Sequence, residues 1–127
     1  MASFFIADDS REKIIMLRHF LKIAGWKGEV LTAMTCADAY DVIAKHADIA
    51  YAFVDYYIPA DNGPSIIRRL KDAAPSCRIA LVSSADSERN AAEARTAGAE
   101  EVLCTTHRSD LVESRFRELL ADWLRGQ

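Results

Sequence analysis

The feature that most constrains the fold is a regular alternation of short apolar runs with longer segments of helical spacing. Predominantly apolar runs stand at residues 3–7, 29–33, 50–54, 78–82 and 101–104. Each is long enough for a buried strand and too short for a helix. Strands that are apolar along their whole length, rather than at every second residue, are typical of a parallel sheet covered on both faces.

The intervening segments predict helices, because their apolar residues recur at intervals of three and four. The first helix is expected to stop at Gly25, and the second carries Tyr40 and Ile43 on its apolar side. The third begins near Pro64 and must end before Pro75, because proline is tolerated in a first helical turn but not in a helix interior. The fourth covers residues 87–97, and its alanine-rich face predicts the least firmly packed helix.

The last helix is predicted from Asp110 and Glu113, which stand at capping-box spacing ahead of an amphipathic segment that ends near Trp123. The order is β-α five times. We therefore predict an α/β fold with a five-stranded, doubly wound parallel sheet, in one domain over residues 1–127.

Composition and charge exclude several classes of protein. Half of the 127 residues are hydrophobic, 28% are charged, and the net charge of −3 gives no electrostatic reason to expect direct binding to nucleic acid or to a membrane. The apolar runs are far shorter than the roughly 20 residues that a membrane span needs. The start of the chain lacks the basic segment of a signal peptide, and three cysteines without a CxxC pair suggest reduced thiols. We therefore expect a cytoplasmic protein.

Polar residues gather where the predicted strands end. Asp8 and Asp9 follow the first strand, Asp55 follows the third, Ser83 the fourth and Thr105 the fifth. If the first and third strands are neighbours, the three carboxylates converge, and such crowding is costly unless a cation or a proton neutralises it. Mg²⁺ is the natural neutraliser, because it prefers oxygen ligands.

An alternative interpretation of one of these residues is structural. Asp9 with Glu12 also fits an N-cap and capping box for the first helix. A cap by itself requires neither Asp8 nor Asp55, so we favour metal binding for the three carboxylates together.

The segment DYYIPADNG, residues 55–63, resembles the phosphoacceptor loop of response-regulator receiver domains. It has an aspartate, an aliphatic residue and proline at plus three and plus four, and glycine at plus eight. Asp8 and Asp9, Ser83 and Gly98 also stand where that family places such residues. The resemblance covers the whole chain and implies the flavodoxin-like (βα)₅ receiver fold of two-component signal transduction.

The resemblance assigns roles to particular residues. Asp9 and Asp55 would ligate Mg²⁺ directly, Asp8 would act through water, and the backbone carbonyl of Tyr57 would complete the protein ligands. Asp55 would accept a phosphoryl group from a histidine kinase or a histidine phosphotransfer protein. Ser83 would hydrogen-bond a phosphoryl oxygen, with Ser84 as its substitute if the register slips by one.

Pro59 and Gly63 would shape the loop after the phosphoacceptor; without the other matches, both would be read as ordinary turn residues. The tyrosine pair at residues 56–57 is unusual for that position. It would either gate access to Asp55, form part of a contact surface, or simply pack on the third helix.

Two positions depart from the family pattern. Thr105 stands where the family has a lysine that pairs with the phosphoryl oxygens, and Val102 replaces an aromatic residue. A charge-assisted hydrogen bond of this kind contributes roughly 1.5–3 kcal/mol, so its loss should weaken the coupling of phosphorylation to the neighbouring loops. His107 and Arg108 are nearby cations that could compensate, although exposed loop residues are the simpler interpretation.

Two functional hypotheses follow. The intact carboxylates favour a signalling receiver, whereas Thr105 and Val102 favour a degenerate receiver that binds a partner independently of phosphorylation. We do not expect a freestanding enzyme, because no glycine-rich phosphate loop follows the first strand and no nucleophile elbow is present. The only expected catalysis is the domain's own phosphoryl transfer and dephosphorylation. The apolar side of the last helix would serve a homodimer if the core left it uncovered, but a core helix is the simpler interpretation.

Overall fold

The computed structural model describes residues 2–106 and 108–125, which form one five-stranded sheet with five helices. The strands are β1 (Ser3–Ala7), β2 (Glu29–Ala33), β3 (Ile49–Val54), β4 (Arg78–Ser83) and β5 (Glu101–Cys104). They lie in the order β2-β1-β3-β4-β5, and every neighbouring pair is parallel. The predicted fold class is confirmed.

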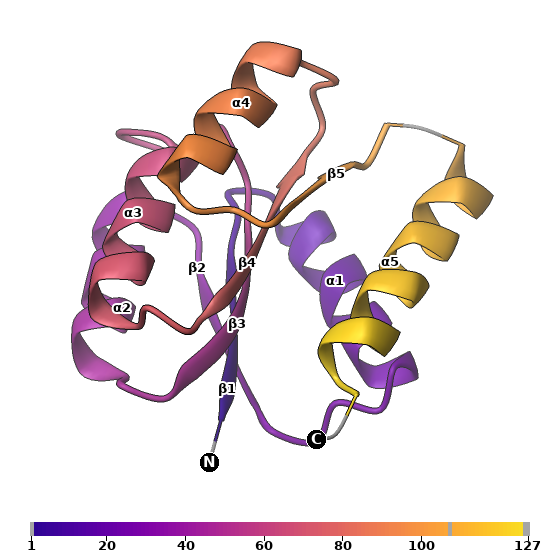
Figure 1. Cartoon of the computed structure of the whole chain (residues 1–127), viewed down its shortest axis with the longest axis horizontal. Helices are drawn as coiled ribbons and strands as arrows, with labels where there is room; N and C mark the ends of the chain where they lie inside the picture. The colour runs from indigo at the N-terminus through magenta and orange to yellow at the C-terminus, as the bar shows by residue number, and fades with distance from the viewer. Residues whose placement is uncertain (1, 107, 126–127) are drawn as a thin grey trace.

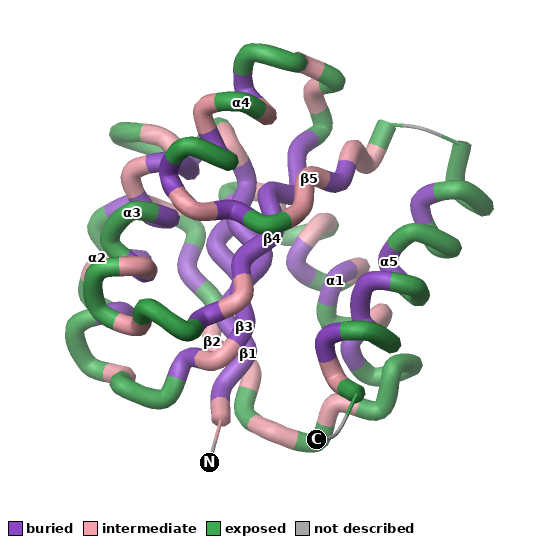
Figure 2. Tube along the Cα trace, in the orientation of Figure 1, coloured by how far each residue is buried: buried purple, intermediate pink, exposed green. Residues whose placement is uncertain are grey.

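The helices are α1 (Arg11–Ile23), α2 (Cys36–Lys45), α3 (Gly63–Ala73), α4 (Glu88–Ala97) and α5 (Ser109–Trp123). Figure 1 shows α1 and α5 on one face of the sheet and α2, α3 and α4 on the other. Each face has its own core, and the central strands between them are buried along their length (Figure 2). This arrangement places the carboxyl ends of β1, β3 and β4 at one edge, where the connections diverge.

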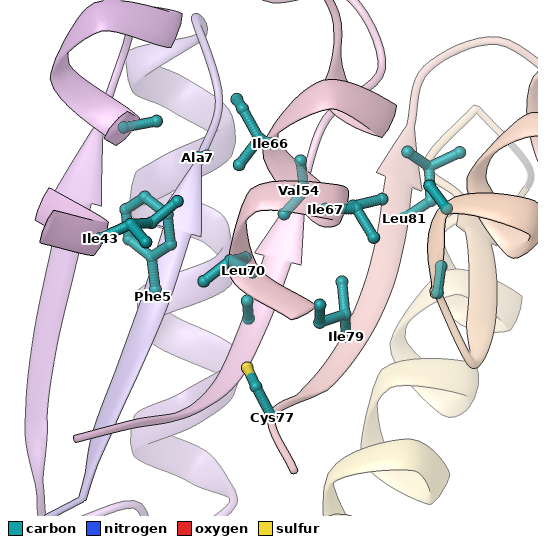
Figure 3. Packing of buried hydrophobic residues seen from close by; sticks show 14 of the residues in the cluster. Phe5, Ala7, Ile43, Val54, Ile66, Ile67, Leu70, Cys77, Ile79 and Leu81 are labelled. Carbon is teal, nitrogen blue, oxygen red and sulfur yellow. The ribbon is translucent and has the colours of Figure 1, made fainter. Parts of the chain in front are cut away.

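The core facing α3 is built from aliphatic side chains of the central strands. Ile66, Ile67 and Leu70 of α3 pack among Val54 of β3 and Ile79 of β4 (Figure 3), and all of these residues are fully buried. At about 25 cal/mol per Å² of apolar surface, burial of such side chains is the main contribution that holds α3 on the sheet. The two edge strands are less covered, since only Ala33 of β2 and Leu103 of β5 are buried.

The cap at Asp9, which was only the alternative interpretation, does not form, and the predicted capping box of the last helix is wrong. Ser10, not Asp9, is the N-cap of α1, and its Oγ accepts a hydrogen bond from the backbone N–H of Lys13 at 3.2 Å. The capping box of the last helix does not form either, because Asp110 already lies in the first turn of α5 and pairs with Arg108 at 2.9 Å. In both cases the helix starts at a different residue from the one that local spacing indicated.

The last helix is an amphipathic core helix, as the simpler interpretation held. Its side chains Val112, Phe116, Leu120 and Trp123 are buried against the sheet, while Leu111 is exposed. Among the described residues, no helix has the length and apolar character that crossing a bilayer requires.

Candidate functional site

Three carboxylates converge at the carboxyl edge of the sheet, as predicted. The backbone N–H of Asp8 donates to Ala33 O at 3.0 Å, and that of Asp55 donates to Ala7 O at 2.8 Å, so both residues are fixed just beyond their strands. One carboxylate oxygen from each of Asp8, Asp9 and Asp55 lies within 4.8 Å of the others. The neighbouring, parallel arrangement of β1 and β3 is the cause of this clustering.

The two inner carboxylates are buried, and this decides their electrostatics. Asp8 is 1% exposed and Asp55 is 6% exposed, whereas Asp9 faces solvent. Burial raises the pKa of the Asp55 carboxyl from 3.8 to about 6; Lys13 opposes this rise and Asp8 adds to it. Burial also raises the pKa of Asp8, against a hydrogen bond from Ser10 and the charge of Lys13. Burial therefore disfavours having the carboxylates of Asp8 and Asp55 both ionised without a neutralising cation.

A lysine that the sequence analysis did not consider reaches into this cluster. Lys13 Nζ lies 2.9 Å from Asp8 Oδ2 and 3.0 Å from Asp55 Oδ1, and it donates to the backbone oxygen of Val82 at 3.0 Å. Its side chain is only 13% exposed. The signal that could have found it was a cation in the first turn of the helix that begins directly after Asp8 and Asp9.

The donor set fits a hard divalent cation. All three converging side chains are carboxylates, and one ammonium group balances only part of their charge. Asp8 Oδ2 is buried, and among the described residues its ion-pair partner is the ammonium of Lys13 at 2.9 Å. An oxygen-rich, net negative cluster open to solvent on the side of Asp9 is the kind of site that Mg²⁺ or Ca²⁺ occupies.

The loop after Asp55 depends on a close approach at Gly63. The N–H of Gly63 donates to Tyr56 O at 2.7 Å, and a side chain at Gly63 would overlap the backbone oxygen of Asp55. Pro59 contributes its backbone oxygen, which accepts a hydrogen bond from Cys36 N at 2.6 Å and ties the loop to α2. The glycine therefore has a specific steric reason to stand eight residues after Asp55.

The residues at the ends of β4 and β5 are held together. Ser83 is the last residue of β4 and is buried, whereas Ser84 is exposed. The N–H of Thr105 donates to Ser83 O at 2.9 Å, and Ser83 Oγ accepts from Ala85 N at 3.1 Å. The Ser83 hydroxyl retains its own proton as a donor. Ser83 is thus the serine that the fold positions at the site edge.

The two tyrosines after Asp55 link the loop to α4. Tyr56 donates its hydroxyl to Glu93 Oε1 at 3.0 Å, and Tyr57 Oη accepts from Asn90 Nδ2 at 3.3 Å. Their rings meet edge to face with centroids 4.8 Å apart. Of the three predicted alternatives, packing on α3 alone does not describe these contacts, because both hydroxyl groups bind side chains of α4.

For Arg108, the simpler interpretation of an exposed loop residue is confirmed. Arg108 is the residue before α5, is exposed, and forms its ion pair with Asp110. His107 lies outside the described residues. Val102 is half-buried and lines a pocket of about 260 Å³ with Leu81, Leu111 and Phe116, between α4 and α5.

Solved structures with the same fold come from several prokaryotes. A CheY-like response regulator receiver domain from Methanospirillum hungatei is 18% identical, with a TM-score of 0.78 over 100% of this chain and 99% of that chain. A response regulator from Burkholderia pseudomallei, determined with a phosphorylated aspartic acid, a calcium ion and citrate, is 22% identical, with a TM-score of 0.75 over 100% and 76%. A receiver domain from Rhodospirillum rubrum is 14% identical, with a TM-score of 0.81 over 99% and 96%.

Sequence comparison is more specific than these likenesses of fold. No curated protein matches the chain. The family profile of the response regulator receiver domain, however, matches residues 4–114, which include every residue of the acidic cluster and all five strands apart from Ser3. The chain therefore belongs to the response regulator receiver domain family.

Proposed function

We propose that this chain is a single cytoplasmic receiver domain, residues 1–127, that accepts a phosphoryl group on Asp55. The donor would be a histidine kinase or a histidine phosphotransfer protein, and the reaction would depend on Mg²⁺. The observation that carries this proposal is the convergence of buried Asp8 and Asp55 with solvent-facing Asp9 at the edge of a receiver-family sheet. The fold relative from Burkholderia pseudomallei holds a phosphorylated aspartate and a calcium ion, which agrees with this proposal.

The residues that would hold the metal are those that the family resemblance assigns. Asp9 and Asp55 would be direct ligands with the backbone carbonyl of Tyr57, and Asp8 would act through water. When bound, the Mg²⁺ ion would supply positive charge that neutralises and orients the phosphoryl oxygens. Asp9 suits this role because Ser10, and not Asp9, caps α1, so the Asp9 carboxylate remains available at the solvent side of the cluster.

The transfer step uses the Asp55 carboxylate as a nucleophile. One of its oxygens forms a new P–O bond while the P–N bond of the donor phosphohistidine breaks. The electron pair of that bond stays on the imidazole nitrogen, which takes up a proton from water. With acetyl phosphate as donor, the bond that breaks joins phosphorus to the acetate oxygen, and acetate leaves. The buried hydroxyl of Ser83 would then donate to a phosphoryl oxygen and draw the end of β4 towards Asp55.

The output of such a switch would run through α4. Residue 102 is valine rather than the family's aromatic residue, and Tyr56 and Tyr57 instead link the Asp55 loop to α4 by direct hydrogen bonds. A change in that loop would therefore move the exposed surface of α4 without a rotating aromatic side chain on β5. The partner that reads this surface would be a protein, since the net charge of −3 gives no attraction to nucleic acid.

The proposal is tested by incubating the protein with Mg²⁺ and acetyl phosphate and measuring its intact mass over time. We expect one added phosphoryl group, which is lost in Asp55→Asn, lost on chelation of Mg²⁺, and retained in the matched control Asp61→Asn. Asp61 is an exposed carboxylate of the same loop. No adduct from either acetyl phosphate or a phosphorylated histidine phosphotransfer domain would contradict the proposal.

A phosphorylation-independent interaction module is the second candidate function. Thr105 and Val102 favour it, because neither side chain can supply the charge or the bulk that the family uses at these positions. In that case the Asp55→Asn protein and the wild type would bind the same partner with equal affinity, whether or not acetyl phosphate is present. A partner affinity that changes on phosphorylation would exclude this second function.

A further inference from the structure

We propose that Lys13 of α1 is the phosphoryl-binding cation of this receiver, acting from another element in place of the lysine that is absent at residue 105. The inference rests on the proposed function, in which Asp55 accepts the phosphoryl group. It differs from the sequence prediction, which looked for a compensating cation at residues 107 and 108.

The geometry places the ammonium group against the reacting carboxylate. Lys13 Nζ lies 3.0 Å from Asp55 Oδ1 and 2.9 Å from Asp8 Oδ2, and it donates to Val82 O at 3.0 Å. An ammonium group has three N–H donors, and these three oxygens can use all of them. In the part of the chain that the structure describes, Lys13 is the one Lys or Arg whose side chain forms an ion pair with this cluster.

The start of α1 fixes where this lysine stands. Ser10 caps the helix by accepting the N–H of Lys13, and the Asp8 carboxylate in turn accepts the N–H of Ser10 at 2.9 Å. The backbone of Lys13 is therefore tied to the residue whose carboxylate its ammonium contacts. Its long stem is only 13% exposed and needs no rearrangement of the backbone to reach Asp55.

The same contact would serve the phosphorylated state. The oxygens of a phosphoryl group on Asp55 lie only two bonds beyond the carboxylate oxygen, within the range that a flexible lysine stem covers. As the phosphoryl group adds negative charge, the ammonium would shift from the carboxylate to a phosphoryl oxygen. Charge-assisted hydrogen bonds of this type are about twice as strong as neutral ones.

A phosphoryl-binding cation on α1 rather than β5 would couple Asp55 to a different part of the structure, the end of β4. Lys13 also binds the backbone oxygen of Val82, the residue directly before Ser83. Any displacement of its ammonium towards a phosphoryl group would weaken this bond and release the end of β4. The hydroxyl of Thr105, just after β5, donates to Ser83 O at 3.4 Å, and this side chain carries no charge to respond. The link from Asp55 to β4 would therefore run through α1.

The test compares rates of phosphorylation by acetyl phosphate at saturating Mg²⁺, with the Mg²⁺ affinity of each variant measured first. Lys13→Met removes the ammonium and keeps an apolar stem, and Lys22→Met is the matched control, an exposed lysine on the same helix. We expect Lys13→Met to be slower by about tenfold or more, as loss of a charge-assisted hydrogen bond implies, and Lys22→Met to match the wild type. If Lys13→Met is unfolded by circular dichroism, Lys13→Gln takes its place.

A rescue experiment separates a charge in the reaction from a merely structural contact. The double variant Lys13→Met with Thr105→Lys restores a cation at the family's own position, and we expect it to recover most of the lost rate. A phosphorylation rate of Lys13→Met within about twofold of the control would overturn the inference, because loss of a charged contact should slow the reaction more than that. A double variant as slow as the single variant would also overturn it. If the wild type itself forms no adduct on Asp55, the proposed function fails instead.

Discussion

Replacing Asp55 with asparagine should make the metal-free protein more stable at neutral pH. Asp55 is 6% exposed, and burial raises its pKa to about 6 from the value of 3.8 expected in the unfolded chain. The folded state therefore disfavours the ionised carboxylate, even with Lys13 beside it. Asparagine has nearly the same shape, carries no charge, and can still accept a hydrogen bond from the lysine.

The size of the effect follows from the two pKa values. The gap between 3.8 and about 6 is about two pH units, and each unit corresponds to about 1.4 kcal/mol, which gives about 3 kcal/mol above pH 6. Part of this is offset, because the asparagine side chain would leave Lys13 facing a single buried carboxylate. We expect a net gain of about 2 kcal/mol in the free energy of unfolding at pH 7.5.

The pH dependence has a definite sign. Because the folded-state pKa of Asp55 is raised, the folded state binds more protons than the unfolded state between pH 3.8 and about 6. The stability of the wild type should fall as the pH rises through this window and level off above it. The advantage of Asp55→Asn should thus be small near pH 4 and complete above pH 6.

Urea unfolding in EDTA, followed by circular dichroism from pH 4 to pH 8, measures this difference, with Asp61→Asn as the control. Added Mg²⁺ should stabilise the wild type and not Asp55→Asn, by about 1.4 kcal/mol at a concentration tenfold above its dissociation constant. Equal stabilities of the two proteins at pH 7.5, or a difference that does not change with pH, would refute the electrostatic argument.

Three further substitutions test other parts of the site. Gly63→Ala should lower the free energy of unfolding by about 2 kcal/mol, because its methyl group would overlap the backbone oxygen of Asp55; an unchanged urea midpoint would argue against this close approach. Ser83→Ala should slow phosphorylation by acetyl phosphate several-fold while the exposed neighbour Ser84→Ala does not, and intact mass against time reads out both. Tyr56→Phe should cost about 1 kcal/mol of stability through loss of its bond to Glu93, and Glu93→Gln in the same background should then add little.

The sequence was sufficient to predict most of the fold. Three of the five strands have the predicted bounds, and the other two differ by one residue, at Ile49 and Ser83. This accuracy has a physical reason: buried parallel strands must be apolar throughout, and glycine and proline mark the ends of the intervening helices. The convergence of Asp8, Asp9 and Asp55 was predicted on the condition that the first and third strands are neighbours, and the strand order confirms that condition.

Local spacing was a weaker guide where two residues could perform the same task. Asp9 and Ser10 are both good N-cap residues, and the choice of Ser10 depends on where the chain turns after β1. Asp110 and Glu113 have capping-box spacing, yet α5 starts one residue before Asp110. Hydrogen-bonding propensity leaves such alternatives nearly equal in energy, so the packing of the helix on the sheet decides between them.

Only the tertiary structure placed Lys13 and the two tyrosines. Lys13 and Asp55 are separated by 42 residues in the chain, and Tyr56 and Glu93 are separated by 37. Contacts of this kind depend on where a long, flexible side chain finds a charge or a hydrogen-bond acceptor on another element, and no periodicity encodes that. The sequence alone therefore determined the sheet and the carboxylates at its edge, because backbone direction controls them. The cation that faces those carboxylates was decided by the packing of α1 beside β1 and β3.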